Sequence, residues 1–180
     1  MIQSGIFDSS AMDIKKLANS IIIFIIKRLI EISGILLMIT GILLFLALIS
    51  YSPDDPNFIF PKNIEIKNFL GFHGSYTSDL FFQSIGLIAF LIPITLLFTG
   101  INIFKRKELV LIIENLFFTI IYSLLGSLFF AFYYIETFNL YINGNGGFIG
   151  DYLNQTFLNS LLSSFKEVGY LSLIFIISIF

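Results

Sequence analysis

The sequence predicts an all-α integral membrane protein with three complete transmembrane helices, a truncated fourth, and an interfacial helix in the second outer loop. Composition is the first reason for this prediction: 57% of the 180 residues are hydrophobic and 12% are charged, and the mean hydropathy is +0.93. Soluble chains carry about 25% charged residues. The remaining charges also leave long apolar runs between them, which is typical of lipid-facing helices.

Charged residues mark the limits of the predicted spans, because a helix needs about 20 apolar residues to cross about 30 Å of hydrocarbon. Three runs are long enough, at residues 32–51, 80–104 and 115–135. Pro93 lies near the middle of the second run, where we expect it to permit a kink or tilt. The run at 168–180 is too short to cross, so we expect an incomplete fourth helix in a piece of a longer protein.

Lysine and arginine predict the orientation of the chain. Seven of the 10 basic residues precede the first span or fill the connection at 105–107, so both segments are expected on the cytoplasmic side of the membrane. Residues 1–28 are then a cytoplasmic segment, with an interfacial helix at 17–26, ahead of a transmembrane domain at 29–180. Apolar residues at steps of three and four predict a second helix, at 149–165, lying on the outer membrane surface.

Several chemistries lack the residues they need. The chain has no cysteine and one histidine, His73, which argues against disulfides, thiolate metal sites and histidine metal clusters. His73 is either a pH sensor or a solvated loop residue, and the second interpretation is favoured. The sequence shows no nucleotide-binding glycine loop and no HExxH motif. We therefore expect no catalytic residue, no cofactor and no metal in this chain.

A short polar motif, Ser52-Pro53-Asp54-Asp55-Pro56, directly follows the first predicted span. Paired aspartates are able to bind a divalent cation, but no third ligand lies close in the sequence. The alternative is a rigid turn, in which the prolines fix φ and an aspartate accepts hydrogen bonds from nearby amides. The turn is the favoured interpretation.

Glycines and polar residues lead into the second predicted span. Asn68 is followed by Gly71 and Gly74, whose spacing indicates a tight outer turn or a short re-entry into the membrane. Ser78 and Asp79 come just before the apolar run, so one of them is expected to cap the first amides of the second helix.

Small residues lie on all three predicted spans, where they allow helices to approach closely. They include Gly34 and Gly41 on the first span, Gly100 on the second, and Ser123 and Ser127 on the third. Their spacing leaves open whether they pack within one chain or between copies. Charged residues lie at the ends of the spans and not in their middles, which disfavours the alternative of a small four-helix transporter or channel subunit.

The combination of these motifs resembles the N-terminal four-helix membrane region of the FtsK/SpoIIIE DNA translocases. The residues that carry the resemblance are Tyr51, Ser52, Pro53, Asp54, Asp55, Pro56, Asn68, Gly71, Gly74, Asp79, Gln83, Gly86, Pro93 and Gly100. The resemblance is strongest over residues 27–107 and looser over the third span and the glycines near residue 147. It supplies no catalytic residue in this region.

The resemblance implies a role in cell division. It implies a membrane anchor that gathers at the septum, associates as a hexamer, and contacts the bilayer and other membrane proteins of the division machinery. Through the full-length protein, such an anchor tethers an ATP-driven motor that moves chromosomal DNA. The 180 residues contain no motor motif, so we expect any contact with DNA to belong to the motor domain.

Overall fold

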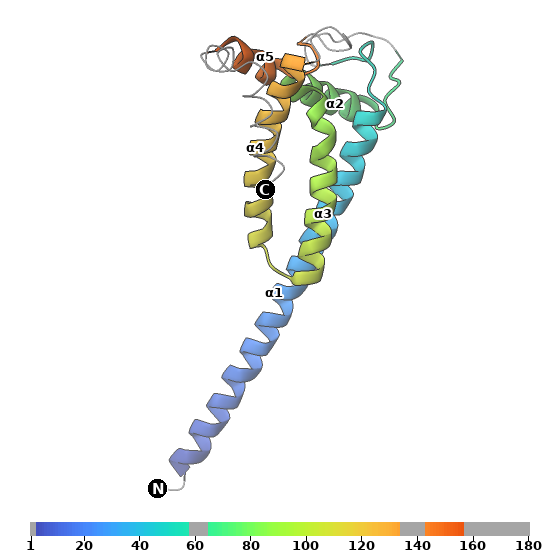
Figure 1. The fold of residues 1–180 in the computed structure, drawn as a ribbon. Helices are drawn as coiled ribbons and strands as arrows, with labels where there is room; N and C mark the ends of the chain where they lie inside the picture. Colours follow the sequence, from blue (N-terminus) through green and yellow to red (C-terminus); the bar gives the residue numbers. More distant parts are fainter. Residues whose placement is uncertain (1–2, 58–64, 134–142, 157–180) are drawn as a thin grey trace.

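The computed structural model describes residues 3–57, 65–133 and 143–156, and every regular element in these ranges is helical (Figure 1). In chain order the elements are α1 (Gln3–Ile49), α2 (Gly71–Ile85), the 3₁₀-helix η1 (Gly86–Phe90), α3 (Leu91–Arg106), α4 (Val110–Tyr133) and α5 (Gly147–Gln155). Three helical stretches are long and apolar enough to cross a membrane, which confirms the predicted number of complete spans: Lys15–Ile49, Gly71–Arg106 and Val110–Tyr133.

Helix α1 is one continuous helix of 47 residues, about 70 Å long at 1.5 Å per residue. Its C-terminal part packs mainly against α3, and its N-terminal part extends away from the other helices (Figure 1). The predicted span at 32–51 corresponds to the packed part. Residues 17–26 belong to the same helix, and their interfacial position stays a prediction.

The second predicted span is not a single helix. Helix α2 lies across one end of the molecule, and η1 then leads into α3, which runs back along α1 (Figure 1). The change of direction occurs at Gly86, where φ is 68°. Pro93 lies in the first turn of α3, where proline is tolerated, so the predicted kink at Pro93 is wrong.

Helix α3 connects to α4 through a tight turn. Lys107 has a φ of 60°, and its amide donates a hydrogen bond of 2.8 Å to the carbonyl of Ile103, which closes the C-terminus of α3. We call this end of the molecule the turn end, and the opposite end, where α2 and α5 lie, the α2 end. Of the predicted helix at 149–165, α5 accounts for residues up to Gln155. The rest of that helix and the predicted fourth span at 168–180 lie outside the described residues.

The buried apolar core is small and lies at the α2 end. It consists of Leu44 and Leu48 of α1, Phe82 and Ile85 of α2, and Ala89 of η1. Many other large apolar side chains face outward, as expected for helices whose surroundings are lipid and not water. The packing of α2 against the end of α1 therefore depends strongly on the polar contacts of the same region.

Candidate functional site

A buried carboxylate follows the end of α1. Asp55 is 3% exposed, and its oxygens accept hydrogen bonds from the backbone amides of Lys67 and Asn68, both at 2.9 Å. A buried carboxylate is costly unless such donors satisfy it. The Asp55 amide itself donates to the carbonyl of Ser52 at 3.2 Å, which closes a local turn. The carboxylate, however, bonds amides 12 and 13 residues away, so it joins two distant segments instead of a single turn.

The neighbouring Asp54 behaves differently. Its carboxylate is exposed and forms an ion pair with the Lys67 ammonium at 3.2 Å. The two aspartates thus have separate partners. Within the described parts of the chain, no three His, Cys, Asp or Glu side chains are grouped to hold a metal ion.

Asn68 closes the C-terminus of α1, whose last carbonyls lack intrahelical donors. Its side-chain amide donates to the carbonyls of Ala47 at 2.9 Å and Ser50 at 3.3 Å. Its side-chain oxygen accepts a hydrogen bond of 3.1 Å from the amide of Leu70. Because Asn68 is 4% exposed, these bonds are shielded from water.

Small residues on α2 let the helix approach this asparagine. A Cβ added at Gly74 would lie 2.0 Å from the side-chain oxygen of Asn68, so no larger residue fits there. Ser75 donates a hydrogen bond of 2.7 Å to the carbonyl of Pro56. Ser78 turns back to the carbonyl of Gly74 at 2.8 Å. Both serines are buried, and they belong to the helix side that faces the end of α1.

A tyrosine and an aspartate complete the contact between α1 and α2. The Tyr51 hydroxyl donates to the Asp79 carboxylate at 3.1 Å, and the Gln83 amide lies 3.4 Å from the same oxygen. Asp79 is 6% exposed and lies in the middle of α2, which begins at Gly71. The prediction that Ser78 or Asp79 caps a helix start is therefore wrong. We refer to the following side chains as the polar clamp: Tyr51, Asp55, Asn68, Ser75, Ser78 and Asp79.

A second junction at the α2 end surrounds the bend at Gly86. The amide of Leu87 donates to the carbonyl of Asn145 at 2.9 Å, and a Cβ added at Gly86 would lie 1.9 Å from that oxygen. A Cβ at Gly147 would lie 2.5 Å from the nitrogen of Gly86. Ser127 of α4 donates to the carbonyl of Ile85 at 2.9 Å. Residues 143–147 are thus packed against the bend at Gly86, and we call these contacts the glycine junction.

Glycines also bring α1 and α3 together between the two ends. A Cβ added at Gly100 would lie 2.6 Å from the carbonyl oxygen of Gly34, and one added at Gly41 would lie 2.9 Å from that of Pro93. The backbones are therefore in direct contact. The spacing of the small residues left open whether they pack within one chain or between copies. Gly34, Gly41 and Gly100 pack within the chain.

An ion cluster joins α1 to the turn end. Glu31 accepts a hydrogen bond from Lys107 at 2.7 Å and another from Arg28. Glu31 is 9% exposed, whereas both cations remain partly in contact with the surroundings. These contacts place the basic residues before the packed part of α1 and the basic residues at 105–107 at the same end of the molecule.

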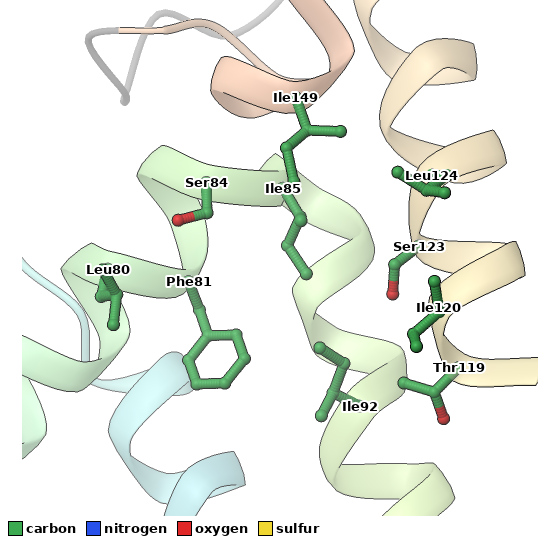
Figure 2. A pocket seen from close by; sticks show the side chains of 10 residues that line it. All are labelled: Leu80, Phe81, Ser84, Ile85, Ile92, Thr119, Ile120, Ser123, Leu124 and Ile149. Carbon is green, nitrogen blue, oxygen red and sulfur yellow. The ribbon is translucent and has the colours of Figure 1, made fainter. Parts of the chain in front are cut away.

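Two apolar cavities lie alongside α2. The first has a volume of about 390 Å³, and its lining comes from α2, α3, α4 and α5 (Figure 2). It includes no charged side chain. The second, of about 350 Å³, lies between α1, α2 and α3, and His73 is its titratable residue. Phe81 and Ile92 contribute to both cavities and separate them.

The structure therefore brings together only part of the predicted motif. The residues around the polar clamp converge at the end of α1, whereas Gly86 belongs to the glycine junction and Pro93 and Gly100 to the contact of α3 with α1. Sequence reasoning did not single out Ser75 or Asn145. A signal for Asn145 did exist in the adjacent glycines, because consecutive glycines permit a close backbone approach.

The arrangement defines a helical membrane region whose buried polar contacts fix the geometry of its helices. Residues 26–180 match the family model of the 4TM region of DNA translocase FtsK/SpoIIIE. The chain belongs to this family. The match covers most of the chain and includes both the polar clamp and the glycine junction.

Curated relatives agree with the family match. The chain is 30% identical over 150 residues to the DNA translocase FtsK of Shewanella oneidensis, an alignment that covers 80% of this chain and 16% of the relative. It is 35% identical over 77 residues to that of Rickettsia bellii, covering 43% of this chain and 10% of the relative. The matched regions thus span a small fraction of these relatives. No solved structure matches the chain.

Proposed function

We propose that the chain is the membrane anchor and septum-localising region of a cell-division DNA translocase, and that it contributes to chromosome segregation through the full-length protein. The observation that carries this proposal is the match of residues 26–180 to the membrane region of FtsK/SpoIIIE. The three apolar helices are consistent with it, since they provide a membrane-embedded body. ATP hydrolysis and DNA translocation belong, in this proposal, to the parent protein and not to this chain.

Within the proposed anchor, the predicted motif residues have a structural role. Asp55 and Asn68 connect the end of α1 to the segment before α2, and Asp79 connects α2 back to Tyr51. Each of these contacts buries a polar group that is satisfied only when the two helices are in place. The motif therefore sets the position of α2 across the end of the bundle.

The proposed orientation puts the N-terminus in the cytoplasm of a bacterial inner membrane, with residues 1–28 as a cytoplasmic segment and 29–180 as the membrane domain. The ion cluster supports this orientation, because the contact of Lys107 with Glu31 places both basic segments at one end. The proposed partners are the lipid bilayer, other copies of the chain in a hexamer, and membrane proteins of the division machinery.

A domain exchange tests the proposal. In the full-length parent protein, residues 1–180 are replaced by an unrelated four-helix membrane domain of the same topology, and septal enrichment is measured by fluorescence microscopy of dividing cells. We expect the exchange to abolish enrichment, while an Asp54→Ala variant of the intact parent retains it, because Asp54 is exposed. Normal septal localisation and division after the exchange would overturn the proposal.

The alternative of a transporter or channel subunit calls for polar or charged groups along a membrane path. The cavity of about 390 Å³ has no charged side chain in its lining. This cavity therefore offers the alternative no specific support.

A further inference from the structure

Two asparagine–glycine pairs follow each other in the segment before α5, at the α2 end of the molecule (Figure 1). They are Asn143-Gly144 and Asn145-Gly146, and every other asparagine in the chain precedes a residue that has a side chain. A glycine after asparagine matters chemically, because without a Cβ the next backbone nitrogen is able to reach the carbon of the asparagine side-chain amide. The glycine junction uses the second pair, whereas the proposed function uses neither pair.

The first pair is exposed and has room to move. The Asn143 side chain lies at the surface, and its amide donates a hydrogen bond of 3.2 Å to the carbonyl of Gln83. Because this bond is itself exposed, water replaces it at little cost. At Gly144 φ is 70°, and no atom of the described structure lies within 4 Å of the place that a Cβ would take. The backbone between these two residues is therefore able to change conformation.

The second pair is held by packing. Asn145 is 3% exposed, and its carbonyl accepts the hydrogen bond of 2.9 Å from the amide of Leu87. A Cβ added at Gly146 would lie 2.4 Å from the carbonyl oxygen of Ser127, so α4 presses against this backbone. Any reaction that needs water and a new backbone conformation at Asn145 must wait until the junction opens locally.

We propose that Asn143 is a site of spontaneous deamidation, and that the glycine junction protects Asn145 from the same reaction. The backbone nitrogen of Gly144 attacks the side-chain carbonyl carbon of Asn143 and forms a new C–N bond. The bond from that carbon to the side-chain nitrogen breaks, and the nitrogen leaves as ammonia with the proton of the Gly144 amide. Water then opens the cyclic imide at either carbonyl and leaves aspartate or isoaspartate. The reaction needs no oxidant or reductant, and it does not depend on the proposed function.

Deamidation changes the contact between this segment and α2. The Asn143 amide is a hydrogen-bond donor to the Gln83 carbonyl, whereas the carboxylate that replaces it has no proton to donate and puts a negative charge beside that oxygen. Isoaspartate also adds a carbon to the main chain. Gln83 lies three residues before the bend at Gly86. We therefore expect the modified chain to hold the glycine junction more loosely.

Site-resolved mass spectrometry tests the proposal. The full chain is incubated in bicelles at mildly alkaline pH, which favours loss of the amide proton, and deamidation at each asparagine is followed by fragment ions. We expect Asn143 to react at least about tenfold faster than Asn145, because Asn145 reacts only after local opening. In denaturant the two rates should converge. Equal rates in the folded protein, or a rate difference that persists after unfolding, would overturn the proposal.

A serine substitution tests the protection of Asn145. Ser127→Ala removes the hydrogen bond of 2.9 Å to the carbonyl of Ile85 in the glycine junction. We expect the rate at Asn145 to rise about two- to tenfold, which corresponds to one lost hydrogen bond, and the rate at Asn143 to stay the same. Ser123→Ala, one turn earlier on α4, is the matched control. A rate at Asn145 that rises in both variants, or in neither, contradicts protection by the junction.

An aspartate variant tests the structural consequence. Asn143→Asp reproduces one product of the reaction, and Asn154→Asp adds the same charge on α5 as a control. Hydrogen exchange of the Leu87 amide reports on the junction, because this amide bonds the carbonyl of Asn145. We expect Asn143→Asp to raise its exchange rate by about threefold or more, and Asn154→Asp to leave it unchanged. Equal exchange rates in the two variants would show that deamidation at Asn143 does not loosen the junction.

Discussion

The two ends of the bundle are held together by different interactions. At the α2 end, buried polar atoms from distant segments satisfy one another: Asp55 bonds the amides of Lys67 and Asn68, and Leu87 bonds Asn145. At the turn end, the connection is an ion cluster of partly exposed cations around one glutamate. Buried groups lose their partners with no water to replace them, whereas exposed charges remain solvated. The α2 end should therefore be the rigid and mutation-sensitive end.

The largest loss of stability is expected for substitutions in the glycine junction. Gly86→Ala combines a positive φ with a Cβ that would lie 1.9 Å from the Asn145 carbonyl, so we expect a loss of several kcal/mol, more than about 3, or failure to fold. The control is Gly144→Ala, where φ is also positive but no atom lies within 4 Å. We expect that variant to lose about 1 kcal/mol. Unfolding free energies measured in bicelles check both, and equal losses would show that backbone conformation, and not packing, dominates.

Substitutions in the polar clamp should cause the next largest loss of unfolding free energy. Asp55→Ala leaves one buried and one partly buried backbone amide without an acceptor, so we expect the free energy of unfolding to fall by about 2–4 kcal/mol. Its neighbour provides the control, since Asp54→Ala removes only an exposed ion pair and should cost under about 1 kcal/mol. Equal losses in the two variants, measured by the same unfolding assay, would mean that the burial of Asp55 does not matter for stability.

Substitutions in the middle of the bundle should cause an intermediate loss of unfolding free energy. Gly100→Ala directs a Cβ to 2.6 Å from the backbone oxygen of Gly34, so the two helices must separate, at a cost of about 1–3 kcal/mol. Gly126→Ala is the matched control. Its new Cβ would lie nearest to two outer carbons of the Ile88 side chain, at 2.4 and 2.5 Å, which are able to rotate away. Unfolding free energies check both variants. If Gly126→Ala lowers the free energy of unfolding more than Gly100→Ala does, the close contact of α1 with α3 contributes less to stability than we expect.

The turn end should show the smallest effect. Glu31→Gln weakens the contacts to Lys107 and Arg28, and we expect a loss of about 1 kcal/mol or less that shrinks as salt is added. Glu114→Gln, at an exposed position in the second turn of α4, should have no measurable effect. A salt-independent loss as large as that of Asp55→Ala would remove the distinction between the ends.

Sequence patterns predicted the helices better than their joints. Charge-free runs located the three crossing segments because hydrocarbon excludes charge along any such helix. The bend at Gly86 was not predictable from neighbouring residues, since its cause is Asn145, nearly 60 positions further along the chain. Pro93 predicted the wrong position for the bend for the same reason. A proline affects the backbone next to it, whereas this bend depends on a tertiary contact with Asn145.

The candidate site shows the same limit at the level of single residues. The prolines and aspartates after α1 correctly indicated a turn, and the Ser52 carbonyl does accept a local hydrogen bond there. They did not indicate which aspartate is buried, because Asp54 and Asp55 are identical in type and adjacent in sequence. The buried one is Asp55, whose oxygens accept hydrogen bonds from the backbone amides of Lys67 and Asn68, 12 and 13 residues further along the chain.

The uninterrupted length of α1 has a mechanical consequence. The helix from Lys15 to Ile49 is a stiff rod of about 52 Å, and the polar clamp holds one end of it. Because Gly34, Gly41 and Glu31 hold α1 to α3, the two helices must tilt together, and a tilt of about 5° at the clamp displaces the far end of α1 by about 4–5 Å. Small rearrangements beside Asn68 would therefore arrive at Lys15, on the other side of the bundle, as a displacement the size of a side chain.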